Sequence, residues 1–453
     1  MASTSHLTLP ELKGMVDRGE IDTIIVAAVD MQGRLQGKRV MPKFFFESVT
    51  ADAITACAYL LATNIECAPV QGYELMNWEK GYGDFFLAPD LSTLRLAPWQ
   101  PGAAIVLCDI ELNGRKPANV SPRAILKKQI DRLKGHGLTA LAATELEFIL
   151  FRNTYEEAWD KGYRGLTPAN QYSNDYSILG TARVEPLIRK IRNAMEAAGI
   201  YVENSKGECN LGQHEINISY GPVLTTCDRH AIYKEASKEI AAEMGYALTF
   251  MAKFNDGEGN SCHTHLSLRD AEQAAVFLDA DGHSPSKIFK QFMAGLLRHA
   301  PEIMLFFAPN VNSYKRFAAG SFAPTALAWG LDNRTCAFRV IGHGKSLHVE
   351  NRIPGGDVNP YLALAAMIAA GLEGIEGDYA PVPLFTGNAY AADLPRVPNT
   401  LDEAARLFNE SEFTRAAFGL DVVKHYANMA RIELDAFNAA VTDWEKFRSF
   451  ERM

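Results

Sequence analysis

Glutamate, histidine, asparagine and arginine recur at every second position in four short, otherwise apolar stretches of the chain. The stretches are 141–150 (LAATELEFIL), 213–220 (QHEINISY), 261–269 (SCHTHLSLR) and 348–353 (HVENRI). Side chains two residues apart on a β-strand share a face, so Glu145 projects beside Glu147 and His263 beside His265. A solvated strand face is typically rich in Lys and Thr, whereas these faces carry almost no lysine. We therefore expect the four strands to build a functional site.

Carboxylates dominate this set, and we expect five of them to converge: Glu145, Glu147, Glu208, Glu215 and Glu350. Five such charges would repel one another by several kcal/mol unless a positive charge lies between them. Divalent cations supply that charge. Oxygen-rich ligation with little imidazole and no thiolate favours Mg²⁺ or Mn²⁺ over zinc. The sequence predicts a cleft that holds hard metal ions.

Cationic side chains follow further along the chain: Lys315, Arg316, Arg334, Arg339, Lys345 and Arg352. The planar fork of arginine pairs with carboxylate and phosphate groups, so we expect an anionic substrate beside a metal-bound phosphate. The chain has no GxxxxGK[ST] loop and no GxGxxG motif that opens a helix. If a nucleotide binds, metals and arginines must hold its phosphates.

The elements that must position these residues change in character along the chain. Residues 21–29 and 34–41 predict a β-hairpin, 105–111 another strand, and the proline-rich segment 84–101 an extended connector. Helices are expected at 124–136, where Ser121 is the expected N-cap, and at 184–198, 229–244, 285–299, 360–373, 401–408 and 421–450. We therefore predict an α+β protein with a small β-rich domain over residues 1–112 and a larger domain over residues 113–453.

The overall composition is that of a globular protein. Its 453 residues are 47% hydrophobic and 22% charged, with 45 Lys and Arg against 54 Asp and Glu, a net charge of −9. These values argue against intrinsic disorder and against nucleic-acid binding, and no apolar stretch is long enough to cross a membrane. The seven cysteines contain no CxxC pair, and the first residues do not resemble a secretory signal. We expect a cytoplasmic protein without disulfides.

Taken together, the motifs resemble those of the glutamine synthetase superfamily, in order and with similar spacing, from about residue 20 to the carboxy terminus. They are ELE (145–147), KGE (206–208), GQHEIN (212–217), HTHLS (263–267), NSYKR (312–316), NR (333–334) with Arg339, ENR (350–352) and VTDWEKFR (441–448). The resemblance implies a small N-terminal β-grasp-like domain and a larger C-terminal catalytic domain with a curved antiparallel sheet. It also implies a homo-oligomer, a dodecamer of two stacked hexamers with active sites between neighbouring subunits.

The resemblance implies two or three divalent ions per site. One ion, near glutamate and the γ-phosphate, would be held by Glu147, Glu208 and Glu215. A second ion, which bridges the phosphates of the co-substrate ATP, would be held by Glu145, His263 and Glu350.

Substrate contacts are implied in the same way. ATP would be contacted by His265, Ser267, Lys345 and Arg339. Arg334 and Arg339 would act as catalytic residues that stabilise the transferred phosphoryl group. Glutamate would be bound by Gly259, Arg316 and Arg352. The implied reaction activates the γ-carboxylate of glutamate as γ-glutamyl phosphate, which an amine converts to an amide.

The chain departs from the family on the amine side. Its flap reads GSFAP (320–324), so Phe322 replaces the usual glutamate, and the nearest counterpart of the ammonium-binding DGSS segment is ATNIE (62–66). His348 also stands where an arginine is usual. An aromatic wall suits an amine with a carbon stem. We expect Phe322, Asn64 and Glu66 in an amine pocket, and Glu258 is a candidate base.

These departures predict a glutamate–amine ligase that uses a small primary amine. Ethanolamine is favoured, because a pocket that loses acids suits a monocation. Putrescine-like amines stay open, since Glu66 and Glu258 restore negative charge, and so does ammonium, which would make the protein an ordinary glutamine synthetase. A non-enzymatic relative is disfavoured, because an unused carboxylate cluster is costly to fold. Tyr390 lies near a region where some bacterial relatives are adenylylated, and we interpret it as an ordinary loop tyrosine.

Overall fold

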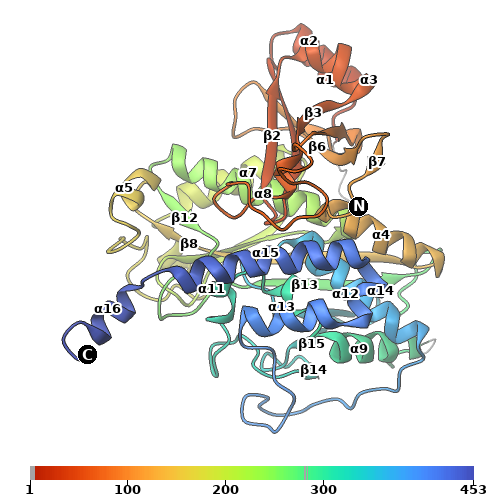
Figure 1. Ribbon diagram of the computed structural model, residues 1–453, viewed down its shortest axis with the longest axis vertical. Helices are drawn as coiled ribbons and strands as arrows, with labels where there is room; N and C mark the ends of the chain where they lie inside the picture. Colours follow the sequence, from red (N-terminus) through yellow and green to blue (C-terminus); the bar gives the residue numbers. More distant parts are fainter. Residues whose placement is uncertain (1–5, 280–281, 283) are drawn as a thin grey trace.

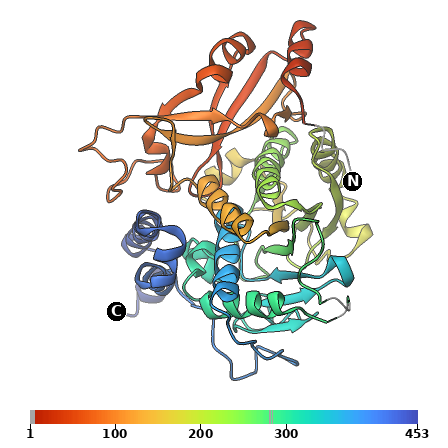
Figure 2. The same ribbon diagram turned by 90° about the vertical axis from the view of Figure 1, so that its right-hand side faces the viewer.

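The computed structural model describes residues 6–279, 282 and 284–453. It contains two β-sheets, one in the amino-terminal part of the chain at the top of Figure 1 and one in the remainder (Figure 2). Helices and strands are mixed throughout both parts. The α+β class is therefore confirmed.

The amino-terminal sheet has the strand order β2-β1-β6-β4-β3, with two short strands, β5 and β7, paired to β6. Its strands are β1 (Thr23–Val29), β2 (Leu35–Val40), β3 (Ile54–Cys57), β4 (Asp84–Pro89), β5 (Arg95–Leu96), β6 (Ala103–Leu112) and β7 (Lys116–Pro117). Its helices and turns are α1 (Leu9–Asp17), α2 (Pro42–Phe44), η1 (Phe45–Val49), α3 (Thr50–Asp52), η2 (Ala58–Leu61) and η3 (Leu91–Thr93). Strand β7 lies just beyond residue 112, where the sequence places the domain boundary, and that division stays a prediction.

The predicted hairpin is confirmed as the antiparallel pair β1–β2. Its turn forms because Asp30 Oδ1 accepts the backbone N–H groups of Gln32 (3.0 Å) and Arg34 (2.9 Å), while Gly33 takes a φ of 80°. The prediction of an extended connector over residues 84–101 is wrong at its start. Strand β4 lies there, between β3 and β6, because its apolar side chains alternate into the core.

The larger sheet has nine strands in the order β14-β15-β16-β13-β8-β10-β9, with β11 and β12 paired to the central strand β8. They are β8 (Thr139–Phe151), β9 (Val202–Gly207), β10 (Gln213–Ile218), β11 (Gly221–Pro222), β12 (Ala247–Thr249), β13 (Cys262–Arg269), β14 (Trp329–Leu331), β15 (Phe338–Ile341) and β16 (His348–Asn351). Every pairing is antiparallel except that of β14 with β15. The expected curved antiparallel sheet is confirmed, and the four polar-faced stretches all lie in it.

Helices pack around this sheet. They are α4 (Pro122–Gly135), α5 (Tyr155–Asp160), α6 (Ile178–Thr181), α7 (Glu185–Ala197), α8 (Val223–Glu243), α9 (Lys287–His299), α10 (Met304–Phe307), α11 (Val311–Tyr314), η4 (Gly344–Ser346), α12 (Pro360–Glu376), α13 (Leu401–Glu410), α14 (Glu412–Phe418), α15 (Leu420–Ala439) and α16 (Asp443–Ser449). The helices predicted before residue 421 are confirmed, although α8 begins at Val223 and Ser121 makes no side-chain cap.

The single helix predicted over residues 421–450 is wrong. Helix α15 ends at Ala439, and α16 begins at Asp443 and extends away from the body of the molecule (Figure 1). Thr442 accepts from the backbone of Glu445 while Glu445 accepts from the backbone of Thr442, which is a capping box. That local signal starts a new helix.

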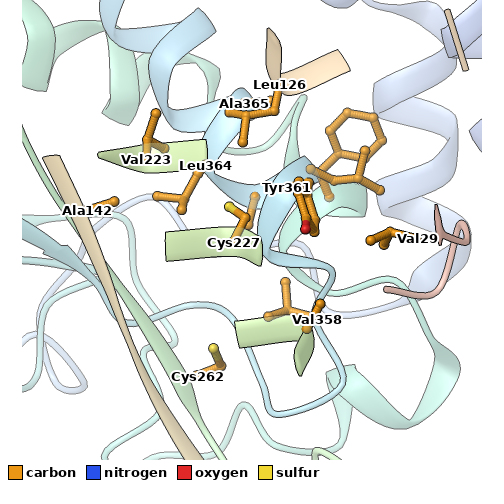
Figure 3. Close-up of a cluster of buried hydrophobic side chains, with 14 of the residues drawn as sticks. Val29, Leu126, Ala142, Val223, Cys227, Cys262, Val358, Tyr361, Leu364 and Ala365 are labelled. Atoms are coloured by element: carbon orange, nitrogen blue, oxygen red, sulfur yellow. The ribbon is translucent and has the colours of Figure 1, made fainter. Parts of the chain in front are cut away.

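Helix α12 lies at the centre of the core. Figure 3 shows its Tyr361 and Leu364 among side chains from other elements, including Leu126 of α4, Cys227 of α8 and Val29 of β1. One continuous buried cluster therefore includes residues of both sheets. Tyr361 O–H donates to Asp228 (2.6 Å), which also accepts from Arg123 (3.1 Å), so the buried charges at this junction are paired.

All seven cysteines are unpaired, as their spacing predicts. Among the residues described, none of the helices is both long and apolar enough to span a bilayer.

Candidate active site

The register of the large sheet brings the predicted ligands together. Pairing of β8 with β10 sets Glu147 opposite Glu215, and pairing of β8 with β13 sets Glu145 opposite His263. Further along, β13 and β16 set His265 opposite Glu350, and β15 sets Arg339 opposite the same glutamate. Residues distant in sequence thus meet on one face.

A cavity of about 850 Å³ opens over this face. It is lined by most of the predicted site residues, namely Glu145, Glu147, Glu208, Glu215, Gly259, His263, Arg316, Phe322, Arg334, Arg339, Glu350 and Arg352. Glu258, the candidate base, also lines it. Carboxylates, arginines and the flap residue therefore share one space.

Glu147, Glu208 and Glu215 form the first carboxylate group, with one oxygen from each residue within 4.8 Å of the others. Burial raises the pKa of each carboxyl to about 7, and the charge of a neighbouring carboxylate adds to the shift: Glu215 acts on Glu147, Glu147 on Glu208, and Glu145 on Glu215. A divalent cation would relieve this repulsion and would find oxygen ligands of the kind that Mg²⁺ and Mn²⁺ prefer. The donor set therefore fits the metal that the sequence predicts.

Glu147 is oriented by neutral donors. Its carboxylate accepts from the backbone N–H of Ser261 (2.7 Å), the hydroxyl of the same serine and Gln213 Nε2 (3.1 Å). Such contacts fix the orientation of the Glu147 carboxylate without neutralising its negative charge.

The second group surrounds Glu145 and Glu350. His263 Nδ1 lies 3.2 Å from Glu145 and 3.3 Å from Glu350, and His265 Nε2 lies 3.3 Å from Glu145. Burial alone would raise the pKa of Glu145, but the adjacent imidazoles of His263 and His265 lower it well below its ordinary value. The atoms of Glu145, His265 and Glu350 also lie within 4.8 Å of one another. Two imidazoles therefore adjoin this pair of carboxylates, and the choice of His263 as the ligand stays a prediction.

Arginines border the carboxylates. Arg339 Nη1 donates to Glu350 (2.9 Å) and its Nη2 to Asp332 (2.5 Å), and Arg352 also pairs with Glu350. Arg316 is buried and donates to the carbonyls of Ile353 (2.7 Å) and Arg352 (3.0 Å). Burial lowers its pKa to about 10, so it stays charged at neutral pH. Positive groups therefore lie directly beside the negative cluster.

The flap residue Phe322 contributes to the cavity wall. Its φ is 57°, its side chain is 57% exposed, and its carbonyl accepts from Arg352 Nη2 (3.3 Å). Tyr390 donates its O–H to the carbonyl of Ala323 (3.1 Å) and so ties its loop to the flap.

Other predicted residues lie outside this cavity. Ser267 and His265 are buried on β13, and Lys345 lies on η4, where its carbonyl accepts from Arg269 (2.6 Å). Asn64 Oδ1 accepts from the backbone of Glu66 (3.1 Å), and neither residue lines the large cavity of its own chain. Their place in an amine pocket stays a prediction.

The sequence reasoning assigned no role to three residues that line the cavity: Asp175, Tyr176 and Lys206. Lys206 lies on β9 two positions before Glu208, which directly follows the strand, and this spacing could have revealed it. Asp175 and Tyr176 lie in an irregular loop without a periodic signal.

Comparisons with known proteins identify the family and the fold. Residues 119–449 match the family model described as glutamine synthetase, catalytic domain. The chain is 56% identical to the gamma-glutamylethanolamide synthetase of Streptomyces coelicolor, over 99% of this chain and 97% of that protein. It is 38% identical to the glutamate–isopropylamine ligase of a Pseudomonas species, over 99% of each chain. The ligand-free structure of GmaS superposes with a TM-score of 0.85 at 26% identity, over 98% of this chain and 99% of that one.

Proposed function

The chain belongs to the glutamine synthetase family, and from this premise we propose that it is an ATP-dependent ligase that joins the γ-carboxylate of glutamate to a small primary amine. Ethanolamine is the favoured amine. The observation that carries the proposal is the single cavity in which a carboxylate cluster, arginines and Phe322 meet. The names of the two relatives above, an ethanolamide synthetase and an isopropylamine ligase, support an amine over ammonium.

In this proposal the two carboxylate groups would hold two or three Mg²⁺ or Mn²⁺ ions, which would supply positive charge for the ATP phosphates and for phosphoryl transfer. Glu147, Glu208 and Glu215 would hold one, and Glu145 and Glu350 would hold a second together with His263.

The remaining side chains bind and orient the substrates. Arg316 and Arg352 pair with the carboxylates of glutamate, and the backbone of Gly259 lies near its amino group. An oxygen of the γ-carboxylate attacks the γ-phosphorus, ADP leaves, and Arg334 and Arg339 stabilise the charge on the transferred group. His265, Ser267 and Lys345 contact the nucleotide.

The amine then completes the reaction. Its nitrogen attacks the carbonyl carbon of γ-glutamyl phosphate, inorganic phosphate leaves, and the amine's proton passes to a base, for which Glu258 is the candidate. Phe322 lies on the wall of this cavity, where an aromatic ring packs against a carbon stem. Asn64 and Glu66 would reach an amine pocket only from a neighbouring subunit, which agrees with the dodecamer of two stacked hexamers that we also propose. We further propose a cytoplasmic location.

An amine panel tests this function. Phosphate release would be measured at fixed glutamate and ATP with ethanolamine, n-butylamine, 1,4-diaminobutane and ammonium, each with Mg²⁺ or Mn²⁺. We expect ethanolamine to give the highest kcat/KM and ammonium at least tenfold less. Ammonium as the best substrate would identify an ordinary glutamine synthetase, and no release with any amine would contradict the proposal.

The flap provides a sharper test of amine selection. Phe322→Glu restores an acid where the cavity now has an aromatic wall, and an acid attracts a small cation that an apolar ring leaves poorly solvated. We expect this variant to gain glutamine formation from ammonium, while Phe322→Leu, the apolar control, does not. An unchanged amine profile in Phe322→Glu would show that the flap is not the selector.

A further inference from the structure

A lysine side chain on the wall of the cavity contacts three groups that suit an organic cation. Lys206 on β9 ion-pairs with Glu208 and lies 3.3 Å from Asp175 Oδ1. Its Nζ also lies 4.2 Å from the centre of the Tyr176 ring. Two carboxylates and the face of an aromatic ring are the groups that bind alkylammonium ions, and here they hold an ammonium that belongs to the protein.

The position of Lys206 places it on the path of an amine's distal end. Glu208 lies inside the cavity with the other carboxylates, whereas Tyr176 and Ile178 line the same cavity with side chains that are 71% and 86% exposed. An amine whose nitrogen reacts beside the carboxylates must extend its carbon stem outward, from Glu208 toward Tyr176 and Ile178. Lys206, whose side chain is 20% exposed, contacts both Glu208 and the ring of Tyr176.

We infer that Lys206 determines the charge class of the amine, so that the enzyme accepts primary monoamines with a neutral tail and rejects diamines. The inference rests on the proposed function and deepens it. A lysine ammonium is charged at neutral pH, and a second ammonium on the substrate would meet it at short range. Asp175 and Glu208 offer that second charge little compensation, because both are paired with Lys206.

A neutral tail meets a different environment. A hydroxyl group carries no charge for the Lys206 ammonium to repel, and its oxygen can accept a hydrogen bond. A purely apolar tail can pack against the rings of Tyr176 and Phe322 without a charge conflict. The same lysine therefore admits hydroxyalkyl and alkyl amines and excludes polyamines.

The test compares two substrates that match in length and differ in the distal charge. These are n-butylamine and 1,4-diaminobutane, used with saturating glutamate, ATP and Mg²⁺. We expect the native enzyme to favour n-butylamine by at least tenfold in kcat/KM. Lys206→Met, which keeps the stem and removes the charge, should lower this preference at least tenfold, mainly through the KM for the diamine. Lys206→Arg, the charge-conserving control, should keep it.

Each other outcome has a defined meaning. Equal use of the two amines by the native enzyme, or an unchanged ratio in Lys206→Met, would overturn the inference. An increased Mg²⁺ requirement with an unchanged ratio would assign Lys206 to the carboxylate cluster instead. If Lys206→Met is insoluble, Lys206→Gln carries the same comparison. Absence of activity of the native enzyme with every amine would overturn the proposed function itself, which separates that failure from a failure of the charge rule.

Discussion

The carboxyl groups of Glu147, Glu208 and Glu215 have raised pKa values because they lie close to other carboxylates in a buried site. Each carboxyl is ordinary in isolation, yet burial and a neighbouring negative charge raise its pKa to about 7. Protons and a divalent cation therefore compete for these three carboxylates near neutral pH. Lys206 ion-pairs with Glu208, one of the three.

Metal affinity should accordingly depend on pH. Near pH 6 the three carboxyls bind protons, whereas near pH 8 they are ionised, so we expect Mn²⁺ to bind at least tenfold more tightly at the higher pH and to release protons. Titration calorimetry in two buffers of different ionisation enthalpy measures both quantities. Glu215→Gln should bind more weakly and release fewer protons. A pH-independent affinity would contradict this account.

At the scale of elements, helices α9 and α12 meet at unusually close range. A Cβ atom added to Gly295 of α9 would lie 2.0 Å from the carbonyl oxygen of Ala370 on α12, and one added to Gly374 would lie 2.1 Å from that of Gln291. Glycine on both helices lets their backbones touch, and this contact supports the core under the site.

Gly295→Ala should therefore destabilise the protein. The added methyl group meets backbone atoms that cannot move independently, so we expect a loss of about 1–3 kcal/mol or more. Gly135→Ala is the matched control: Gly135 ends α4, nothing lies within 4 Å of the added Cβ, and a gain of about 0.5–1 kcal/mol is expected. Thermal unfolding compares the two. An unchanged midpoint in Gly295→Ala would show that the helices can separate without cost.

At the scale of the whole molecule, buried histidines join parts that are distant in sequence. His425 Nε2 of α15 lies 2.9 Å from the sulfur of Met31, which follows β1. The centre of the His425 ring lies 4.4 Å from that of Tyr73. His230 of α8 contacts Thr144 of β8 at 3.0 Å. Burial lowers the pKa of both histidines to about 3.

These histidines should make the fold sensitive to acid. The pKa of His425 in the folded protein lies below the ordinary 6.5. As the pH falls below 6.5, the histidine is therefore protonated in the unfolded chain but not in the folded protein. The free energy of unfolding decreases as a result. His425→Phe should remove the contribution of this histidine to the loss of stability, which is about 1.4 kcal/mol per pH unit between roughly pH 6.5 and 5. The measurement is the difference in Tm between variant and native protein at each pH, with about pH 7.5 as baseline. A difference that does not change with pH would refute the assignment.

The sequence itself determined most of the local structure and the chemistry of the site. Alternation of polar and apolar residues predicted the strands that carry Glu145, Glu215 and Glu350, because side-chain direction along a strand has a fixed period. Residue type alone then pointed to hard metal ions and anionic substrates. Where a local signal was overlooked, as at Thr442, an element boundary was wrong.

Tertiary structure decided which of these residues meet. The register of β8 with its neighbours sets Glu147 opposite Glu215. Alternation within a strand excludes a slip by one residue but not by two, so only the folded sheet fixes this pairing. The raised carboxyl pKa values and the position of Lys206 on the cavity wall follow from the same packing. They depend on burial and on distances between residues remote in the chain, which only the folded molecule fixes.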